Sequence, residues 1–319
     1  MKTLRILLIL AFMASMLAPA ALAGMTGLPN PVHEATRREA EEAAGEFFFL
    51  PPLPEGVEEA DYSYIDAPPD DPEGRVIAQA MFDWVGTRCL LRGALTDELE
   101  DISGMYYDWV FDRGMRIGVF HGRVMFVDGG PGLAQWYDIL QNATYSVSID
   151  EGATLEKLMT LANSMAEYQY EEPPEMPGEG LEGIVLPGLG WAEKTDANAV
   201  AAALGFALEA PQGAENAGHY LYTRSGPLYL AAVRYELKGV QQVCWAQKGE
   251  EAFDISEVYY PWPKWEAAAL GSFEAVLSYK PGGEGLITWF DQETGISRAV
   301  AVVTGASPET LLAAATSFI

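Results

Sequence analysis

The chain has 319 residues, of which 49% are hydrophobic and 11% aromatic, a composition that excludes a disordered polymer. Its length allows about two domains of roughly 150 residues each. The 46 acidic residues against 19 basic ones give a formal net charge of −27 at pH 7. A field of this sign argues against nucleic acid and anionic lipid surfaces as partners, and it favours cations or basic polypeptides. Acidic side chains that only keep the protein soluble are the simpler explanation.

The N-terminus has the pattern of a secretory signal peptide. Lys2 and Arg5 precede an apolar stretch, Ile6–Leu17, and the small residues of Ala21-Leu22-Ala23 suit a signal peptidase. We expect cleavage after Ala23. An uncleaved anchor is the alternative, but the stretch is short against the roughly 20 residues of a membrane span. The sequence therefore predicts an exported protein, extracellular or periplasmic, that is not integral to the membrane after processing.

A helix over Glu34–Ala44 is predicted first, ended by Gly45. A Pro-rich acidic stretch, Asp66–Gly74, follows. Its carboxylates Asp66, Asp70, Asp71 and Glu73 could bind calcium weakly, but they lack the EF-hand pattern, and a solvated loop is the preferred interpretation.

Strands separated by Gly-rich turns make up the middle of this half, which indicates hairpins and an antiparallel sheet. A helix capped by Thr154 closes it, and an apolar stripe along that helix is expected to pack on the sheet. The predicted strands are Arg75–Trp84, Met115–Phe120, Arg123–Val127 and Thr144–Ile149.

The second half repeats this layout after a Pro-, Gly- and Glu-rich linker. A helix over Asn198–Leu204 ends near Gly205, and a closing helix begins after Ser307. The strands predicted between them are Leu228–Leu237, Phe273–Tyr279, Gly285–Phe290 and Ser297–Val303.

Direct sequence matches indicate a duplication. The box Asp101–Trp109 recurs as Asp254–Trp262, with six of nine residues identical at an offset of 153 residues. The same offset relates Trp136 to Trp289. Upstream matches require larger offsets: Cys89 to Cys244 at 155, Tyr62-Ser63-Tyr64 to Tyr220-Leu221-Tyr222 at 158, and Gly45 to Gly205 at 160.

We therefore predict an α+β protein of two tandem repeats, each an antiparallel curved sheet with an N-terminal and a C-terminal helix packed on it. The predicted divisions are a signal peptide at 1–23, a first repeat at 24–166, an acidic linker at 167–186 and a second repeat at 187–319.

Several segments resemble an uncharacterised family of bacterial exported domains. They are Asn30-Pro31, the Asp-Ile-Ser-Gly box at Asp101, Trp136, Tyr145–Ser148 and Leu155–Met165. Domains of this family occur in exported proteins of unknown function and beyond the membrane span of anti-sigma-factor-like proteins. The resemblance implies an extracytoplasmic α+β domain without established catalytic residues. Curved sheets of lipoprotein carriers, which hold acyl chains or peptides, are a more distant fold analogy.

Catalytic and cofactor motifs are absent from the sequence, so we predict no catalytic residues, no cofactor and no metal site. His33, His121 and His219 lie at unrelated positions and show no metal-ligand spacing. Asp101 and Asp254 could be matched ligand carboxylates, but capping of a turn is the favoured interpretation.

The repeated tryptophans Trp109, Trp136, Trp262 and Trp289 are candidate binding residues, because aromatic side chains line binding grooves. Filling of the two cores is the more common role of a repeated Trp. Cys89 and Cys244 are expected to be two separate buried thiols, since a disulfide would require the two Cα atoms to lie within about 7 Å.

These patterns favour a non-catalytic extracytoplasmic binding or sensing module that engages a protein or peptide. The alternative is a carrier of an apolar ligand in a curved-sheet cavity. A carrier should contain a deep cavity lined by Trp and Leu, whereas an interaction module should have filled cores and an exposed apolar patch.

Overall fold

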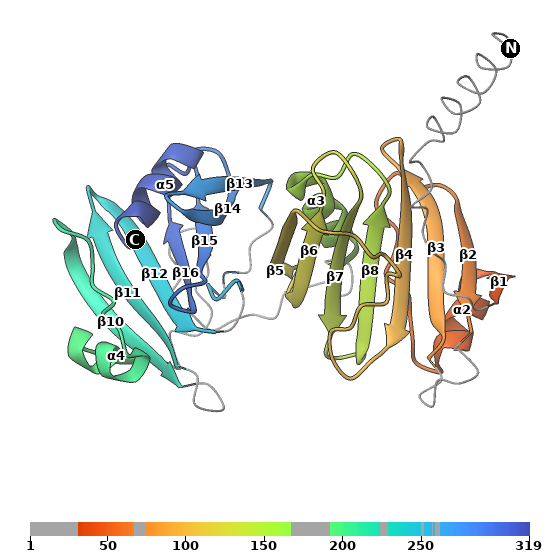
Figure 1. Ribbon diagram of the computed structural model, residues 1–319, viewed down its shortest axis with the longest axis horizontal. Helices are drawn as coiled ribbons and strands as arrows, with labels where there is room; N and C mark the ends of the chain where they lie inside the picture. The colour runs from red at the N-terminus through yellow and green to blue at the C-terminus, as the bar shows by residue number, and fades with distance from the viewer. Residues whose placement is uncertain are drawn as a thin grey trace, which may run out of the picture.

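The computed structural model describes residues 31–66, 75–166, 192–223, 229–249, 252–256, 258 and 262–319. Within this part the chain is a mixed α+β protein with two antiparallel sheets and four helices (Figure 1), which confirms the predicted class and the two sheets. None of the described helices is long and apolar enough to cross a membrane. The predicted signal peptide and linker lie outside the described residues, so the domain boundaries remain predictions.

The first sheet has the strand order β1-β2-β3-β4-β8-β7-β6-β5, and all its neighbouring strands are antiparallel. Helix α2 (Arg37–Ala44) follows β1, and α3 (Leu155–Ala166) follows β8. The strands are β1 (Val32–Ala35), β2 (Ala60–Ile65), β3 (Ile77–Trp84), β4 (Thr87–Leu95), β5 (Phe111–Ile117), β6 (Phe120–Phe126), β7 (Gly132–Asp138) and β8 (Ala143–Ile149).

The second sheet has the same order when its strands are numbered from β9, namely β9-β10-β11-β12-β16-β15-β14-β13. Helix α4 (Ala197–Leu204) follows β9, and α5 (Pro308–Thr316) follows β16. The strands are β9 (Ala192–Thr195), β10 (Glu215–Thr223), β11 (Tyr229–Leu237), β12 (Val240–Lys248), β13 (Lys264–Leu270), β14 (Phe273–Tyr279), β15 (Gly285–Asp291) and β16 (Ile296–Val302).

Strand register establishes which residues of the two repeats correspond. Trp136 pairs with Tyr145, and Trp289 pairs with Arg298, so each member of the first pair is 153 residues before its counterpart. The β3–β4 turn and the β11–β12 turn are related by the same offset. Val85 in the first and Lys238 in the second both have a positive φ, 50° and 53°, and a glycine follows each. Ala35 pairs with Tyr62 as Thr195 pairs with His219, which confirms the offset of 160 for the first helix and for Gly45 with Gly205.

Two of the sequence matches are wrong by this criterion. Leu91 faces Val147 as Cys244 faces Val300, so Cys244 corresponds to Leu91 and not to Cys89. Tyr62 pairs with Ala80, and the residue that corresponds to Ala80 in the second repeat, Val233, pairs with His219. Tyr62 therefore corresponds to His219, so the Tyr62-Ser63-Tyr64 match is shifted by one residue. Identity of residue type ignores the alternation of a strand, in which a slip of one residue reverses the face of every side chain.

Other predicted elements differ in extent. The predicted strand Met115–Phe120 is wrong, because a two-residue turn at Gly118-Val119 divides it between β5 and β6. The predicted helix Glu34–Ala44 begins too early: β1 extends to Ala35, and Thr36 caps α2 through a capping box with Glu39.

A turn after β6 in the first repeat, and after β14 in the second, joins the sheet to the closing helix. The Gly129 N–H donates to the Ala153 carbonyl at 2.9 Å, and the Gly282 N–H donates to the Ala306 carbonyl at 2.8 Å. Glycine is required at the first position of the next strand, because a Cβ on Gly132 or on Gly285 would lie 2.6 Å from the Cβ of Ala153 or Ala306. We call this set of contacts the glycine lock.

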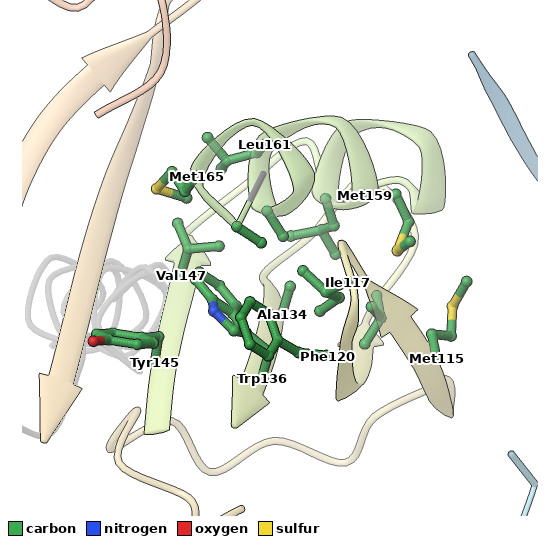
Figure 2. Packing of buried hydrophobic residues seen from close by; sticks show 14 of the residues in the cluster. Met115, Ile117, Phe120, Ala134, Trp136, Tyr145, Val147, Met159, Leu161 and Met165 are labelled. Carbon is green, nitrogen blue, oxygen red and sulfur yellow. The ribbon is translucent and has the colours of Figure 1, made fainter. Parts of the chain in front are cut away.

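The closing helix covers the core of the first repeat. Figure 2 shows Leu161 and Met165 of α3 on one side and Trp136, Tyr145 and Val147 of the sheet on the other. The Trp136 and Tyr145 rings lie 5.6 Å apart, and both side chains have no exposed surface. In the second repeat α5 contacts β15 and β16, which carry the buried Trp289 and Val300.

The two repeats also pack on each other. Helix α3 contacts β13, and two ion pairs cross the contact: Lys264–Glu156 at 2.7 Å and Arg113–Glu274 at 2.8 Å. The Phe253 ring lies 4.6 Å from that of His121. One hydrophobic cluster contains residues from both repeats, so the apolar layer is continuous across the contact.

We expect Gly132→Ala and Gly285→Ala to destabilise the protein by similar amounts, roughly 1–3 kcal/mol each, because the added methyl group must displace the loop that begins the closing helix. Denaturant unfolding of the two variants measures the effect. Ala134→Gly is the control, because it changes a neighbouring buried residue of β7 without adding an atom. Its loss of stability measures the cost of a substitution in this strand without overpacking. A neutral result for either glycine would contradict the lock.

Candidate functional site

A pocket of about 810 Å³ opens at one end of the first repeat. It lies between the C-terminal end of α2, the end of β4 and the turn that joins β7 to β8. Phe47, Leu95 and Leu140 contribute its large apolar side chains, with exposed fractions of 76%, 38% and 70%. We call it the Phe47 pocket. Sequence reasoning did not identify these residues.

Local backbone structure directs these side chains outward. Phe48 is buried in the core, so its neighbours Phe47 and Phe49 project to the surface. Asp138 holds the β7–β8 turn by accepting hydrogen bonds from the N–H groups of Leu140 at 2.8 Å and of Gln141 at 3.3 Å. The tip residues Ile139 and Leu140 are consequently exposed.

The buried Tyr145 connects the two sides of the pocket. Its hydroxyl group donates to the Phe49 carbonyl at 2.8 Å and lies 3.1 Å from Oε1 of Gln141, which lines the pocket. The Phe49 backbone and the β7–β8 turn are therefore held together by a side chain of the core.

Acidic side chains border the pocket. Glu46 and Asp97 line it and are exposed, and neither forms an ion pair with another described residue. Arg75, the basic residue of the lining, is paired with Glu100. Partial desolvation raises the pKa of the nearby Tyr137 phenol, and the charges of Asp97, Asp138 and Glu98 raise it further. An apolar surface with a negative border results.

The repeated box has a structural role at its aspartates. Asp101 accepts the Ser103 N–H at 2.9 Å, and Asp254 accepts the Ser256 N–H at 2.9 Å. Asp101 also accepts from the Gln135 side chain at 2.9 Å. These bonds confirm that both carboxylates cap a turn.

The four candidate tryptophans are not brought together at one surface. Trp136, Trp289 and Trp262 are 0%, 3% and 7% exposed, and Trp109 is partly buried beside Tyr107, with ring centroids 5.2 Å apart. Trp136 and Trp289 occupy corresponding positions, and each buries an indole N–H without a partner among the described residues. This shared feature indicates that the two cores derive from one ancestral core. Of the four, Trp109 is the one with substantial accessible surface.

Within the described residues no group of three His, Cys, Asp or Glu side chains could hold a metal ion. The three histidines have different surroundings: His33 contacts Asp66 at 2.7 Å, His121 contacts Phe253, and His219 contacts the Leu208 carbonyl at 3.0 Å. The other residues proposed for weak calcium binding, Asp70, Asp71 and Glu73, lie outside the described part of the chain.

Cys89 and Cys244 are both free and buried, which confirms two separate thiols. Burial raises the pKa of the Cys89 thiol to about 12 and also raises the pKa of Cys244. Neither side chain is poised as a nucleophile, because the reactive form is the thiolate.

Comparison with known proteins gives no family. No protein-family model matches the chain, and no curated protein matches it. Among solved structures, the crystal structure of MucB in complex with MucA(peri) is matched at 10% sequence identity over 81% of this chain and 86% of that chain, with a TM-score of 0.19. A TM-score this low supports no conclusion about fold or function, and the resemblance to exported bacterial domains remains a prediction.

We expect neither thiol to react with Ellman's reagent in the native protein at pH 8, because both are buried and protonated. Both should react at once when the protein is unfolded in guanidinium chloride, which serves as the control. Rapid native labelling of either residue, located by mass spectrometry, would contradict this description.

The free energy of unfolding should fall as the pH rises above about 8.5. Thiols of the unfolded chain ionise near that pH, whereas the folded-state pKa of Cys89 is about 12, so the unfolded state loses protons first. The expected loss is about 1 kcal/mol per thiol between pH 7.5 and 9.5. Urea unfolding at the two pH values measures it, and a Cys89→Ala/Cys244→Ala variant should lose correspondingly less. Equal slopes for the two proteins would contradict the assignment.

Proposed function

We propose that this chain is an exported, non-catalytic binding module whose partner is a protein or peptide. In this proposal residues 1–23 are removed on export, and the linker 167–186 joins two repeats, 24–166 and 187–319. Each repeat is a curved antiparallel sheet that carries an N-terminal and a C-terminal helix.

The Phe47 pocket is the observation that carries the proposal. Phe47 and Leu140 expose 76% and 70% of their surface beside Leu95, although the core below them is filled by Phe48 and Tyr145. Large apolar side chains gathered at one surface are typical of protein interaction sites. The energetic cost of exposing them is offset when a partner covers them.

A carrier function is supported less well. Its ligand would occupy a deep cavity lined by Trp and Leu, but Trp136 and Trp289 are packed within the two cores. The Phe47 pocket has no Trp in its lining and mixes apolar groups with Glu46, Asp97, Gln141 and Asn142. A non-catalytic role is favoured because the repeated carboxylates Asp101 and Asp254 are engaged in turn hydrogen bonds.

Co-purification tests this proposal. The protein is expressed with its own leader in its native cell and isolated from envelope and medium, and bound proteins and lipids are then identified by mass spectrometry. We expect one protein in near-stoichiometric amount that is absent from an unrelated exported bait of similar negative charge. A stoichiometric lipid without a protein would favour the carrier, and the absence of both would contradict a binding module.

A further inference from the structure

The second repeat is an internal control for the surface of the first. Strand register and the first-helix offset assign counterparts to the residues around the Phe47 pocket that lie at the end of the first helix, on β4 and in the β7–β8 turn. Five of these positions are exposed in both repeats; all five hold a large apolar side chain in the first repeat, whereas the second has four polar residues and one alanine. The first repeat carries Phe47, Phe49, Leu95, Ile139 and Leu140, and the second carries Ala207, Glu209, Lys248, Gln292 and Glu293 in the same order.

The turn after the seventh strand and the contact between the first helix and the fourth strand recur in both repeats, whereas the backbone at the end of the first helix differs, with φ of 155° at Gly45 and 78° at Gly205. Asp291 holds the β15–β16 turn as Asp138 holds the β7–β8 turn, by accepting the Glu293 N–H at 3.0 Å. A Cβ on Gly45 would meet the Leu95 side chain, and one on Gly205 would meet the Lys248 side chain, so the contact between the first helix and the fourth strand is also preserved.

Buried positions between these exposed ones stay apolar. Phe48 corresponds to Leu208, with exposed fractions of 1% and 2%, and Ala143 corresponds to Ile296. The fold thus requires apolar residues at the buried positions and accepts polar ones at the exposed positions. Exposed apolar residues in the first repeat are therefore not explained by folding.

The border of the pocket specifies the charge of its partner. Glu46, Asp97 and Glu98 are exposed and form no ion pair with other described residues, and Arg75 is already paired with Glu100. A partner that brings Lys or Arg beside these carboxylates gains charge complementarity, and the net charge of −27 accelerates its approach.

We infer that the Phe47 pocket of the first repeat docks a polypeptide segment that presents apolar side chains flanked by Lys or Arg. The corresponding end of the second repeat does not bind such a segment. This inference rests on the proposed function and adds the location of the site and the chemistry of the partner.

A repeat-swap variant tests the inference. It places the residues of the second repeat in the first: Phe47→Ala, Phe49→Glu, Leu95→Lys, Ile139→Gln and Leu140→Glu. The variant has one more net negative charge than the native protein, so weaker binding of a basic peptide cannot come from a lower net negative charge, and Phe47→Ala, which changes no charge, excludes local repulsion by Leu95→Lys. Val85→Lys is the matched control, because Val85 is also exposed, corresponds to Lys238 and lies beyond the opposite end of β4.

The probe is a library of random 12-residue peptides displayed on phage and selected on the native full-length protein. Enriched peptides are synthesised and their affinities measured by fluorescence anisotropy. We expect sequences that combine Leu, Ile, Phe or Trp with Lys or Arg. The repeat-swap variant should bind them at least about tenfold more weakly, as expected when central apolar anchors are removed, and Val85→Lys should bind them as the native protein does.

Equal affinity of the repeat-swap variant, enrichment of peptides without basic residues, or no enrichment at all would overturn the inference. Phe47→Ala alone, which truncates one exposed side chain, keeps the test decisive if the fivefold variant fails to fold. A native dimer that the variant abolishes, detected by analytical ultracentrifugation, would instead assign the pocket to a second copy of this chain. If the native protein co-purifies with a partner and the variant retains it, the proposed function stands and the inference fails.

Discussion

The close approach of the closing helix to its sheet is the contact on which each repeat depends. It is possible because Gly132 and Gly285 have no side chain: a Cβ there would lie 2.6 Å from the next loop. The loop is then held by backbone hydrogen bonds to the turn after β6 or β14, with lengths of 2.8 to 3.1 Å in the two repeats. With the loop fixed, the helix that follows covers Trp136 or Trp289 and completes the core.

The two copies differ on the surfaces that take no part in the glycine lock, such as the sheet face opposite the closing helix. In the first repeat the sheet face away from α3 holds a buried polar group, Arg92, which donates to the Gln79 side chain at 3.2 Å and to the Ser103 carbonyl. Its counterpart is Trp245, part of the apolar cluster that continues into the first repeat. The second repeat thus places an apolar side chain where the first places a hydrogen-bonded arginine, although this face is packed in both repeats. Duplication gave one scaffold, and the two copies differ on its surfaces.

Much of the fold follows from local patterns in the sequence. Turn glycines, helix caps and repeated landmarks predict the α+β class, the antiparallel pairing and the two closing helices. The short strands β1 and β9 were not predicted, because four residues carry too little periodicity to distinguish a strand from a loop, and the longer strands β2, β10 and β13 were not predicted either. The Phe47 pocket was not predicted because its sides are distant in sequence, from α2 to the β7–β8 turn. A signal was nevertheless present: Phe47-Phe48-Phe49 aligns with Ala207-Leu208-Glu209, in which only the buried central residue keeps a large apolar side chain.

Native-state hydrogen exchange at the glycine lock tests most directly whether the repeats share one scaffold. The relevant amides are those of Gly129, Gly152 and Ala153 in the first repeat and Gly282, Gly305 and Ala306 in the second. All six lie in turns or loops, where amides ordinarily exchange fast. If the lock anchors each closing helix, these amides should be protected to the same degree in both repeats and nearly as strongly as those of the central strands β8 and β16. Fast exchange at these amides in either repeat would contradict the account.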